Sequence, residues 1–183
     1  DKGLPNELCD EIITESEKYK IQDATVGSDN AGAKLNNEVR SSTIRWVDPT
    51  VASSKFIHNL LFDFATQANR NAFGFNITSL HQIQYTIYEG EQQDFYNWHF
   101  DTFWANSGQY DRKVSLTVQL SHPEDYEGGE FQLDSQYIQP DSVQLKNRGT
   151  VLAFPSVIQH RVLPVTKGVR KSLVAWVEGP KFR

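Results

Sequence analysis

The chain has 183 residues and a formal net charge of −5, and this acidic balance argues against nucleic-acid binding, which usually requires a basic face. It contains one cysteine, Cys9, so an intrachain disulfide is excluded and a reducing, cytoplasmic location is expected. We see no apolar run as long as a membrane-spanning helix and expect no membrane association. This length is typical of one domain, and we predict a single domain over residues 1–183.

The first part of the chain, about residues 1–75, is expected to supply supporting helices. Pro5 and the amphipathic pattern after it predict a helix over about residues 5–20. A Gly- and Asn-rich loop is predicted at 26–37, and a strand at 39–47. The same periodicity predicts a second helix over residues 52–72. The apolar face of this second helix is expected to carry Phe56, Leu60, Phe64 and either Leu61 or Ile57.

From residue 81 onward, short β-branched or aromatic runs alternate with turn signals. The predicted strands cover residues 81–88, 96–99, 113–120, 129–133, 142–145, 150–154, 161–165 and 170–177. About eight short strands suit a double-stranded β-helix, or jelly roll, over about residues 80–178. The expected fold class is therefore α+β, mainly β, with N-terminal helices supporting one sheet. Gly128 and Gly129 are expected to form a hairpin turn.

The candidate chemistry begins with His99 and Asp101 in the stretch NWHFDTFW. In an extended segment residues i and i+2 point to the same side, so both side chains are expected at one mouth of the barrel. His160 is the candidate third ligand. Two histidines and one carboxylate on one face of Fe(II) leave open positions, which an O₂-activating oxygenase needs. The alternative is that His99 and Asp101 belong to an ordinary strand.

Arg170 follows His160 by ten residues and is expected to return to the same cavity. A buried guanidinium is costly unless it is paired, and a ligand carboxylate would pair with it bidentately. Ser172, two residues later, would face the same way and donate a further hydrogen bond. Together these residues predict a pocket for a small dicarboxylate that also chelates iron, a description that 2-oxoglutarate fits. The alternative for Arg170 is an exposed strand residue.

Several stretches carry a family resemblance: YEGEQQDFYNWHFD (88–101), VSLTVQLSHPEDYEGGEF (114–131) and GTVLAFPSVIQHRVLPVTKGVRKSLVAW (149–176). They resemble the prolyl-4-hydroxylase-type 2-oxoglutarate/Fe(II) dioxygenases, and most closely the PKHD-type hydroxylases. The likeness covers roughly residues 80–177. In addition, EVRSSTIRWV (38–47) is similar to the strand after the finger loop of the oxygen-sensing prolyl hydroxylases.

The resemblance implies roles for individual residues. The iron-ligand places fall on His99, Asp101 and His160, and Arg170 takes the place that binds the distal carboxylate of 2-oxoglutarate. Tyr88 matches a family tyrosine at the co-substrate pocket, with Tyr85, expected on the same face, as the alternative. Gln119 stands where some relatives have a tyrosine that touches the co-substrate. The family also binds ascorbate as a reductant, so ascorbate is a further expected ligand.

The implied activity is that of a 2-oxoglutarate- and Fe(II)-dependent dioxygenase, which uses O₂ to hydroxylate an unactivated C–H bond and releases succinate and CO₂. The resemblance favours a prolyl residue in a peptide or protein, with residues 26–39 closing over it. Arg40 and Trp104 are candidate substrate contacts, with a salt bridge and simple packing as their alternatives. Trp46 and Trp176 are assigned to the core. Two other functions stay open: hydroxylation of a free amino acid or other small molecule, and a non-catalytic jelly-roll binding module.

Overall fold

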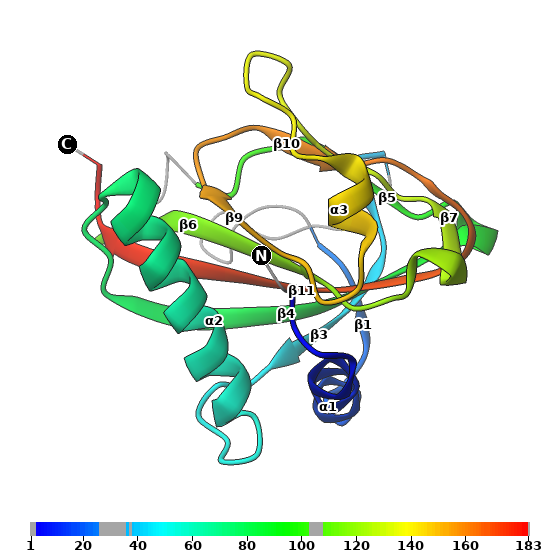
Figure 1. Ribbon diagram of the computed structural model, residues 1–183, viewed down its shortest axis with the longest axis horizontal. Helices are drawn as coiled ribbons and strands as arrows, with labels where there is room; N and C mark the ends of the chain where they lie inside the picture. Colours follow the sequence, from blue (N-terminus) through cyan, green and yellow to red (C-terminus); the bar gives the residue numbers. More distant parts are fainter. Residues whose placement is uncertain (1–2, 26–35, 37, 103–107, 183) are drawn as a thin grey trace.

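The computed structural model describes residues 3–25, 36, 38–102 and 108–182. Two antiparallel sheets face each other. In spatial order the large sheet contains β1 (Gln22–Asp23), β3 (Thr43–Val47), β4 (Ser79–Glu89), β11 (Val165–Pro180), β6 (Tyr110–Gln119) and β9 (Val151–Pro155), and β7 (Tyr126–Gly128) also pairs with β11. The small sheet contains β2 (Arg40–Ser41), β5 (Phe95–His99), β10 (His160–Val162) and β8 (Phe131–Leu133). In Figure 1 the large sheet crosses the middle of the view, with β5 and β10 above it.

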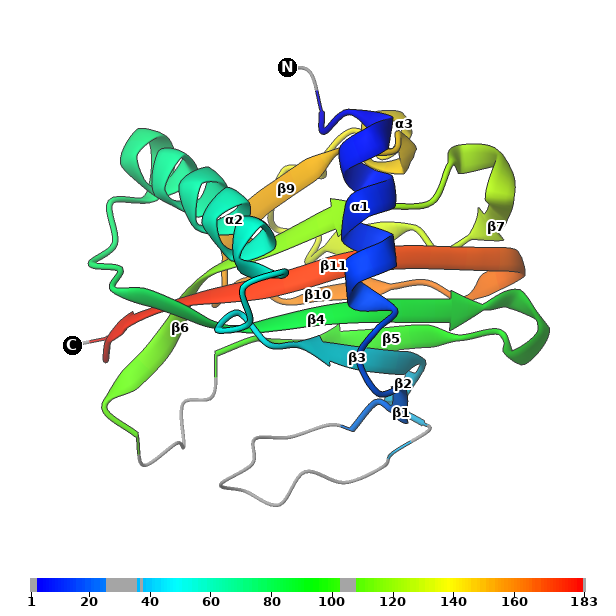
Figure 2. The same cartoon turned by 90° about the horizontal axis from the view of Figure 1, so that it is seen from below.

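Two helices cover the outer face of the large sheet, as Figure 2 shows. They are α1 (Asn6–Ser16) and α2 (Lys55–Ala68), which lie within the ranges predicted for them. A π-helical segment, η2 (Asn69–Phe73), extends α2 and ends at Gly74, whose φ is 69°. Two short 3₁₀ segments, η3 (Gly90–Gln92) and η4 (Pro123–Asp125), follow β4 and β6. Within the described part of the chain, no helix is long and apolar enough to cross a membrane.

The buried face of α2 is shifted by one residue along the sequence from the face that was predicted to be buried. Its fully buried residues are Ile57, Leu61 and Ala65, while Phe56, Leu60 and Phe64 are only partly buried beside them. The small Ala65 allows the helix to approach the sheet closely, and the larger side chains of Phe56, Leu60 and Phe64 pack beside this contact. Burying a side chain such as Leu61 contributes roughly 1.5–3 kcal/mol, so this face holds α2 in place.

The central strand β11 separates an apolar core from a polar interior by alternation. Leu173, Ala175 and Val177 are fully buried on the side of the helices. Arg170 and Ser172 lie on the opposite side, between the sheets, because neighbouring residues of a strand point to opposite faces. The neighbouring strands β4 and β6 show the same alternation. The helices therefore stabilise one face of the large sheet and leave its other face free to line a cavity.

Several predicted strands were wrong in their type or extent. Residues 142–145 belong to a helix, α3 (Ser142–Lys146), because the Asp141 side chain accepts hydrogen bonds from the backbone N–H groups of Val143 and Gln144. The predicted break between 161–165 and 170–177 is also misplaced. Residue 165 onward forms one long strand, whose first part pairs with β7 and whose remainder pairs with β4 and β6.

Gly128 and Gly129 have positive φ values, 79° and 66°, as expected for a tight turn. They do not close a hairpin, however, because β7 pairs with β11 in the large sheet and β8 pairs with β10 in the small one. The two glycines therefore carry the chain from one sheet to the other. Gly129 donates its backbone N–H to Pro164 O at 3.0 Å, which fixes this crossing next to the start of β11.

Candidate functional site

One cavity between the two sheets brings together seven of the nine residues singled out from the sequence. They are Arg40, Tyr88, His99, Asp101, His160, Arg170 and Ser172. Of the other two, Gln119 lines an adjoining cavity, and Trp104 lies outside the described residues. The cavity also has aromatic walls from both sheets, which are formed by Tyr96, Phe131, Phe154 and Trp176.

The small sheet places the two histidines beside each other. His99 is the last residue of β5, His160 is the first residue of β10, and the two are Cα partners in the ladder. Their ring centroids are 4.1 Å apart. Asp101 follows β5, and its backbone N–H donates to Ser156 O at 3.1 Å in the turn that leads to β10. This backbone contact turns the carboxylate towards both imidazoles.

Both imidazoles are held in the tautomer that a metal ligand needs. His99 Nδ1 lies 2.8 Å from Asn97 O, and His160 Nδ1 lies 2.9 Å from Ile158 O. Because a carbonyl oxygen only accepts, each Nδ1 carries the proton and each Nε2 keeps a free lone pair. The Nε2 atoms of His99 and His160 lie 3.7 Å and 3.5 Å from the two oxygens of Asp101. Three possible ligand atoms thus converge, an arrangement that a bound cation would stabilise.

The charges of this cluster suit a divalent ion. Burial, followed by repulsion from His160, lowers the pKa of His99 to about 3, so its imidazole is neutral at pH 7. Burial alone would raise the pKa of Asp101, but the imidazoles, Arg112 and the Ser115 hydroxyl lower it below its ordinary value. Ser115 Oγ donates to Asp101 Oδ2 at 2.6 Å. Neutral imidazoles with one carboxylate are a donor set that fits Fe(II).

At another part of the cavity wall, Arg170 of β11 lies opposite Tyr88 of β4 in the ladder. The guanidinium carbon is 5.5 Å from the centroid of the Tyr88 ring. Arg170 is only 5% exposed, and within the described ranges no oxygen forms a hydrogen bond or close ion pair with it, although the Glu130 carboxylate is near enough to interact with its charge. Leaving a guanidinium buried and unpaired costs several kcal/mol. A ligand carboxylate would remove this cost, so the cavity also fits a small dicarboxylate that reaches from the cation site to Arg170.

Tyr85 is not an alternative to Tyr88. It lies opposite Leu173 in the ladder, on the side of the helices, and its hydroxyl donates to Glu17 Oε1 at 3.2 Å. Residues three apart in a regular strand point to opposite faces, so the expectation that both tyrosines share a face was wrong.

Ser172 and Gln119 are Cα partners on β11 and β6, but they occupy different cavities. Ser172 is 1% exposed and lines the cavity that contains the histidines. Gln119 lines the adjoining cavity, which it shares with Arg170. Gln119 Nε2 donates to Ser121 O at 3.2 Å, and its Oε1 is buried without a hydrogen-bond partner among the described residues. The two cavities therefore meet at Arg170.

Arg40 lies on β2 and is 6% exposed. Its guanidinium carbon is 4.4 Å from the centroid of the Tyr96 ring, and its Nε donates to Ser42 Oγ at 2.9 Å. In the part of the chain that the structure describes, it forms no salt bridge with a carboxylate, which was the alternative considered from the sequence. The proposed closing segment, 26–39, lies largely outside the described residues.

None of the four aromatic residues in the cavity walls was assigned to the site from the sequence, and two of them are informative. Tyr96 stacks on the His99 imidazole, with ring centroids 3.5 Å apart and an interplanar angle of 9°. Trp176 is buried, at 6% exposure, as its core assignment expected, and it also lines the cavity, where alternation from Arg170 along β11 would have placed it. The core assignment of Trp46 was wrong, because this residue is 39% exposed.

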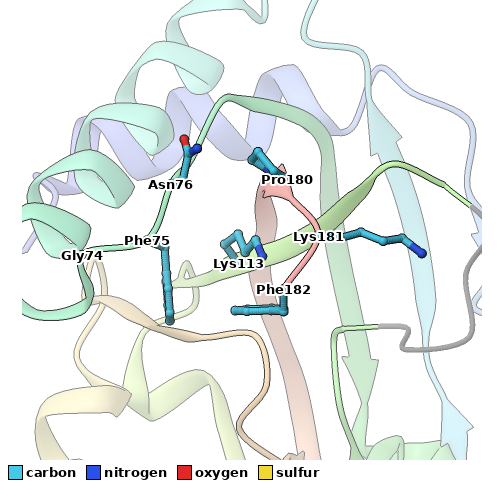
Figure 3. Close-up of a pocket in the computed structure, with 7 residues that line it drawn as sticks. All are labelled: Gly74, Phe75, Asn76, Lys113, Pro180, Lys181 and Phe182. Carbon is cyan, nitrogen blue, oxygen red and sulfur yellow. The ribbon is translucent and has the colours of Figure 1, made fainter.

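A separate cavity shares no lining residue with the first. It is lined by Gly74, Phe75, Asn76, Lys113, Pro180, Lys181 and Phe182 (Figure 3). Lys113 is 4% exposed, and its ammonium nitrogen lies 3.2 Å from the centroid of the Phe182 ring. None of the residues singled out from the sequence lies here.

Comparison with known proteins agrees with the resemblance seen in the sequence. The model of the 2OG-Fe(II) oxygenase superfamily matches residues 83–178, which is more than half of the chain. A PKHD-type hydroxylase of Gloeothece citriformis is 28% identical over 176 residues, which cover 95% of this chain and 74% of the relative. A PKHD-type hydroxylase of Thermosynechococcus vestitus is 39% identical over 89 residues, which cover 45% of this chain and 37% of the relative.

Solved structures show the same fold at low identity. A Pseudomonas putida prolyl-4-hydroxylase has a TM-score of 0.67 at 19% identity, covering 97% of this chain and 89% of its own. The viral collagen prolyl hydroxylase of Paramecium Bursaria Chlorella virus-1, in its 2OG complex, also has a TM-score of 0.67 at 19% identity, with coverages of 96% and 92%. These similarities confirm the α+β, mainly β class with a jelly-roll core. The chain belongs to the 2OG-Fe(II) oxygenase superfamily, and its enzyme class is that of the 2-oxoglutarate-dependent Fe(II) dioxygenases.

Proposed function

We propose that this dioxygenase hydroxylates a prolyl residue in a peptide or protein, with His99, Asp101 and His160 as the Fe(II) ligands. We further propose that Arg170 binds the distal carboxylate of 2-oxoglutarate beside Tyr88. One observation carries the metal assignment: one possible ligand atom from each of the three residues lies within 4.8 Å of the other two. The unpaired guanidinium of Arg170 in the same cavity supports the co-substrate assignment.

When Fe(II) and 2-oxoglutarate are bound, they activate O₂ for the hydroxylation of a C–H bond. The protein's own contribution is to hold the donor atoms in a fixed arrangement. Backbone carbonyls orient the imidazoles of His99 and His160, and Ser115 orients the carboxylate of Asp101. The aromatic walls of the cavity exclude water from the space beside these ligands.

The peptide substrate is supported by the names of structural neighbours and by the cavity walls. A prolyl hydroxylase of Trichoplax adhaerens, solved with an oxygen-degradation-domain peptide fragment of hypoxia inducible factor, has a TM-score of 0.61 at 17% identity, with coverages of 94% and 89%. The rings of Phe131 and Trp176 line the cavity and provide apolar surfaces against which a pyrrolidine ring can pack. We also propose ascorbate as a reductant that sustains turnover.

The first test is an anaerobic titration with Fe(II) and then 2-oxoglutarate, observed through the visible metal-to-ligand charge-transfer band of the chelate. We expect the band in the wild type and its loss in Asp101→Ala. Asp94→Asn is the matched control, because Asp94 is also buried but its carboxylate accepts from Ser41 Oγ and the Glu89 N–H, away from the cluster. A folded wild type without the band would refute the proposed site.

The second test screens proline-containing peptides and free amino acids for succinate release that is coupled to hydroxylation. Coupled turnover of a prolyl peptide supports the proposed substrate. Turnover of a free amino acid, with none of any peptide, would assign the enzyme to small molecules and refute the peptide proposal. Because the titration does not depend on the substrate, its result stands whichever substrate is found.

A further inference from the structure

Arg40, Tyr96 and His99 form a stack of three planar groups, and we infer that Tyr96 is a positioning residue that sets the plane of the His99 imidazole, with Arg40 clamping the Tyr96 ring. This inference rests on the proposed role of His99 as an iron ligand. The imidazole covers one face of the Tyr96 ring at a centroid distance of 3.5 Å and an angle of 9°. The Arg40 guanidinium, 4.4 Å from the same centroid, therefore lies over the other face.

An irregularity in the small sheet makes this stack possible. Tyr96 and His99 are three residues apart, and in a regular strand they would point to opposite faces. The ladder pairs His160 with His99 but Val162 with Tyr96, so β5 contains one residue more than β10 between these two pairs. Such a bulge re-aims the side chains beside it. As a result both Tyr96 and His99 line the same cavity.

The stack supplies a restraint that the hydrogen bond of His99 does not. The bond from Nδ1 to Asn97 O fixes one point of the ring but leaves the ring free to tilt about it. A parallel contact with a buried ring fixes the plane as well, and hence the direction of the Nε2 lone pair. No parallel ring holds the other imidazole within the described part of the chain: Phe131 and Phe154 are inclined to His160 by 31° and 70°.

Arg40 is well placed to hold the Tyr96 ring. The two are Cα partners in the ladder between β2 and β5. The Arg40 guanidinium lies over the Tyr96 ring, with its central carbon 4.4 Å from the ring centroid, so the contact is a cation–π interaction. The bond from Arg40 Nε to Ser42 Oγ fixes the orientation of the guanidinium. Arg40 is therefore held both by the hydroxyl of Ser42, two residues along the chain, and by the Tyr96 ring that its guanidinium covers.

The test measures Fe(II) affinity and the energy of the 2-oxoglutarate chelate band in Tyr96→Leu, Tyr96→Phe and Arg40→Met, in the full chain without O₂. Removing a group that supports a metal ligand typically weakens metal binding by about 10- to 100-fold. We expect a loss in this range and a shifted band in Tyr96→Leu, and wild-type values in Tyr96→Phe, which keeps the ring. Arg40→Met is expected to weaken Fe(II) binding about threefold, because the ring stays but loses its clamp.

Tyr85→Leu is the matched control, because Tyr85 is a buried tyrosine on the opposite face of the large sheet. It is expected to lower the thermal midpoint without changing the Fe(II) affinity. Equal affinity and equal band energy in the wild type and Tyr96→Leu would overturn the inference. If Tyr96→Leu does not fold, an unchanged Fe(II) affinity in Arg40→Met would refute the inference that Arg40 holds the Tyr96 ring in place. Failure of the wild type to bind Fe(II) would instead refute the proposed site.

Discussion

Replacing Arg170 by methionine is expected to separate the stability of the protein from its affinity for 2-oxoglutarate. Arg170 is buried, contacts the Tyr88 ring and, in the described residues, has no acceptor for its guanidinium. Methionine retains an unbranched apolar stem of similar length. The substitution therefore removes the charge while most of the packing against Tyr88 and Gly129 is kept.

The two expected effects have opposite signs. In the absence of 2-oxoglutarate, the variant loses a cation–π contact of about 1 kcal/mol and the attraction of Arg170 to the Glu130 carboxylate, and it is relieved of the several kcal/mol needed to bury a charge without a close partner. The free energy of unfolding should therefore rise by about 1 kcal/mol or more. Truncating one partner of a buried charge pair typically costs about 3 kcal/mol of binding energy, so the dissociation constant of 2-oxoglutarate should increase by about two orders of magnitude.

The assays are urea denaturation without co-substrate and anaerobic titration of the Fe(II)-loaded protein with 2-oxoglutarate. Lys171→Met is the control, because the neighbouring Lys171 forms an ion pair with Glu17 on the side of the helices. It should lose at most about 1 kcal/mol of stability and keep its co-substrate affinity. An unchanged dissociation constant of 2-oxoglutarate in Arg170→Met would show that another residue binds its distal carboxylate. A fall in stability of several kcal/mol would show that Arg170 is a structural cation.

Three other predictions concern packing, backbone and pH. Leu61→Ala should cost about 3 kcal/mol in urea denaturation and leave Fe(II) affinity unchanged, since Leu61 is 1% exposed under α2. Gly129→Ala should cost at least about 1–2 kcal/mol and weaken 2-oxoglutarate binding in the titration, because φ is +66° and a Cβ would lie 2.9 Å from Arg170 Cδ. Without metal, stability should fall as the pH drops from 6 to 4, because unfolded His99 binds a proton near pH 6.5 and folded His99 only near pH 3. This contributes up to about 1.4 kcal/mol per pH unit, and His99→Gln should show a shallower slope in a pH series of urea denaturations; an equal slope would contradict the assignment.

Much of the architecture follows from local patterns that the sequence displays. The helices α1 and α2 and the strands β4, β5, β6 and β9 lie close to their predicted ranges, because periodicity reports which face of an element is buried. The spacing of His99, Asp101, His160 and Arg170 likewise sufficed to name them as candidates that share one cavity, since alternation along a strand is a local rule.

Other features depended on interactions between distant parts of the chain. Residues 142–145 have a strand-like composition, but the cap from Asp141 makes them helical. The long β11 continues through the predicted turn because β7 supplies hydrogen-bond partners for its first part. Tyr96 faces the cavity together with His99 only because pairing with β10 introduces a bulge into β5.

The sequence by itself indicated the class of fold and the donor atoms available for a metal, because these depend on residue types and on short-range periodicity, and its resemblance to known proteins indicated the family. The tertiary structure alone decided which aromatic rings line the cavity, that Tyr96 stacks on His99, and that Arg170 separates the cavity of the histidines from the one lined by Gln119. The physical reason is strand register: a shift of one residue turns a side chain to the other face of a sheet, and register is set by partners that are far away along the chain.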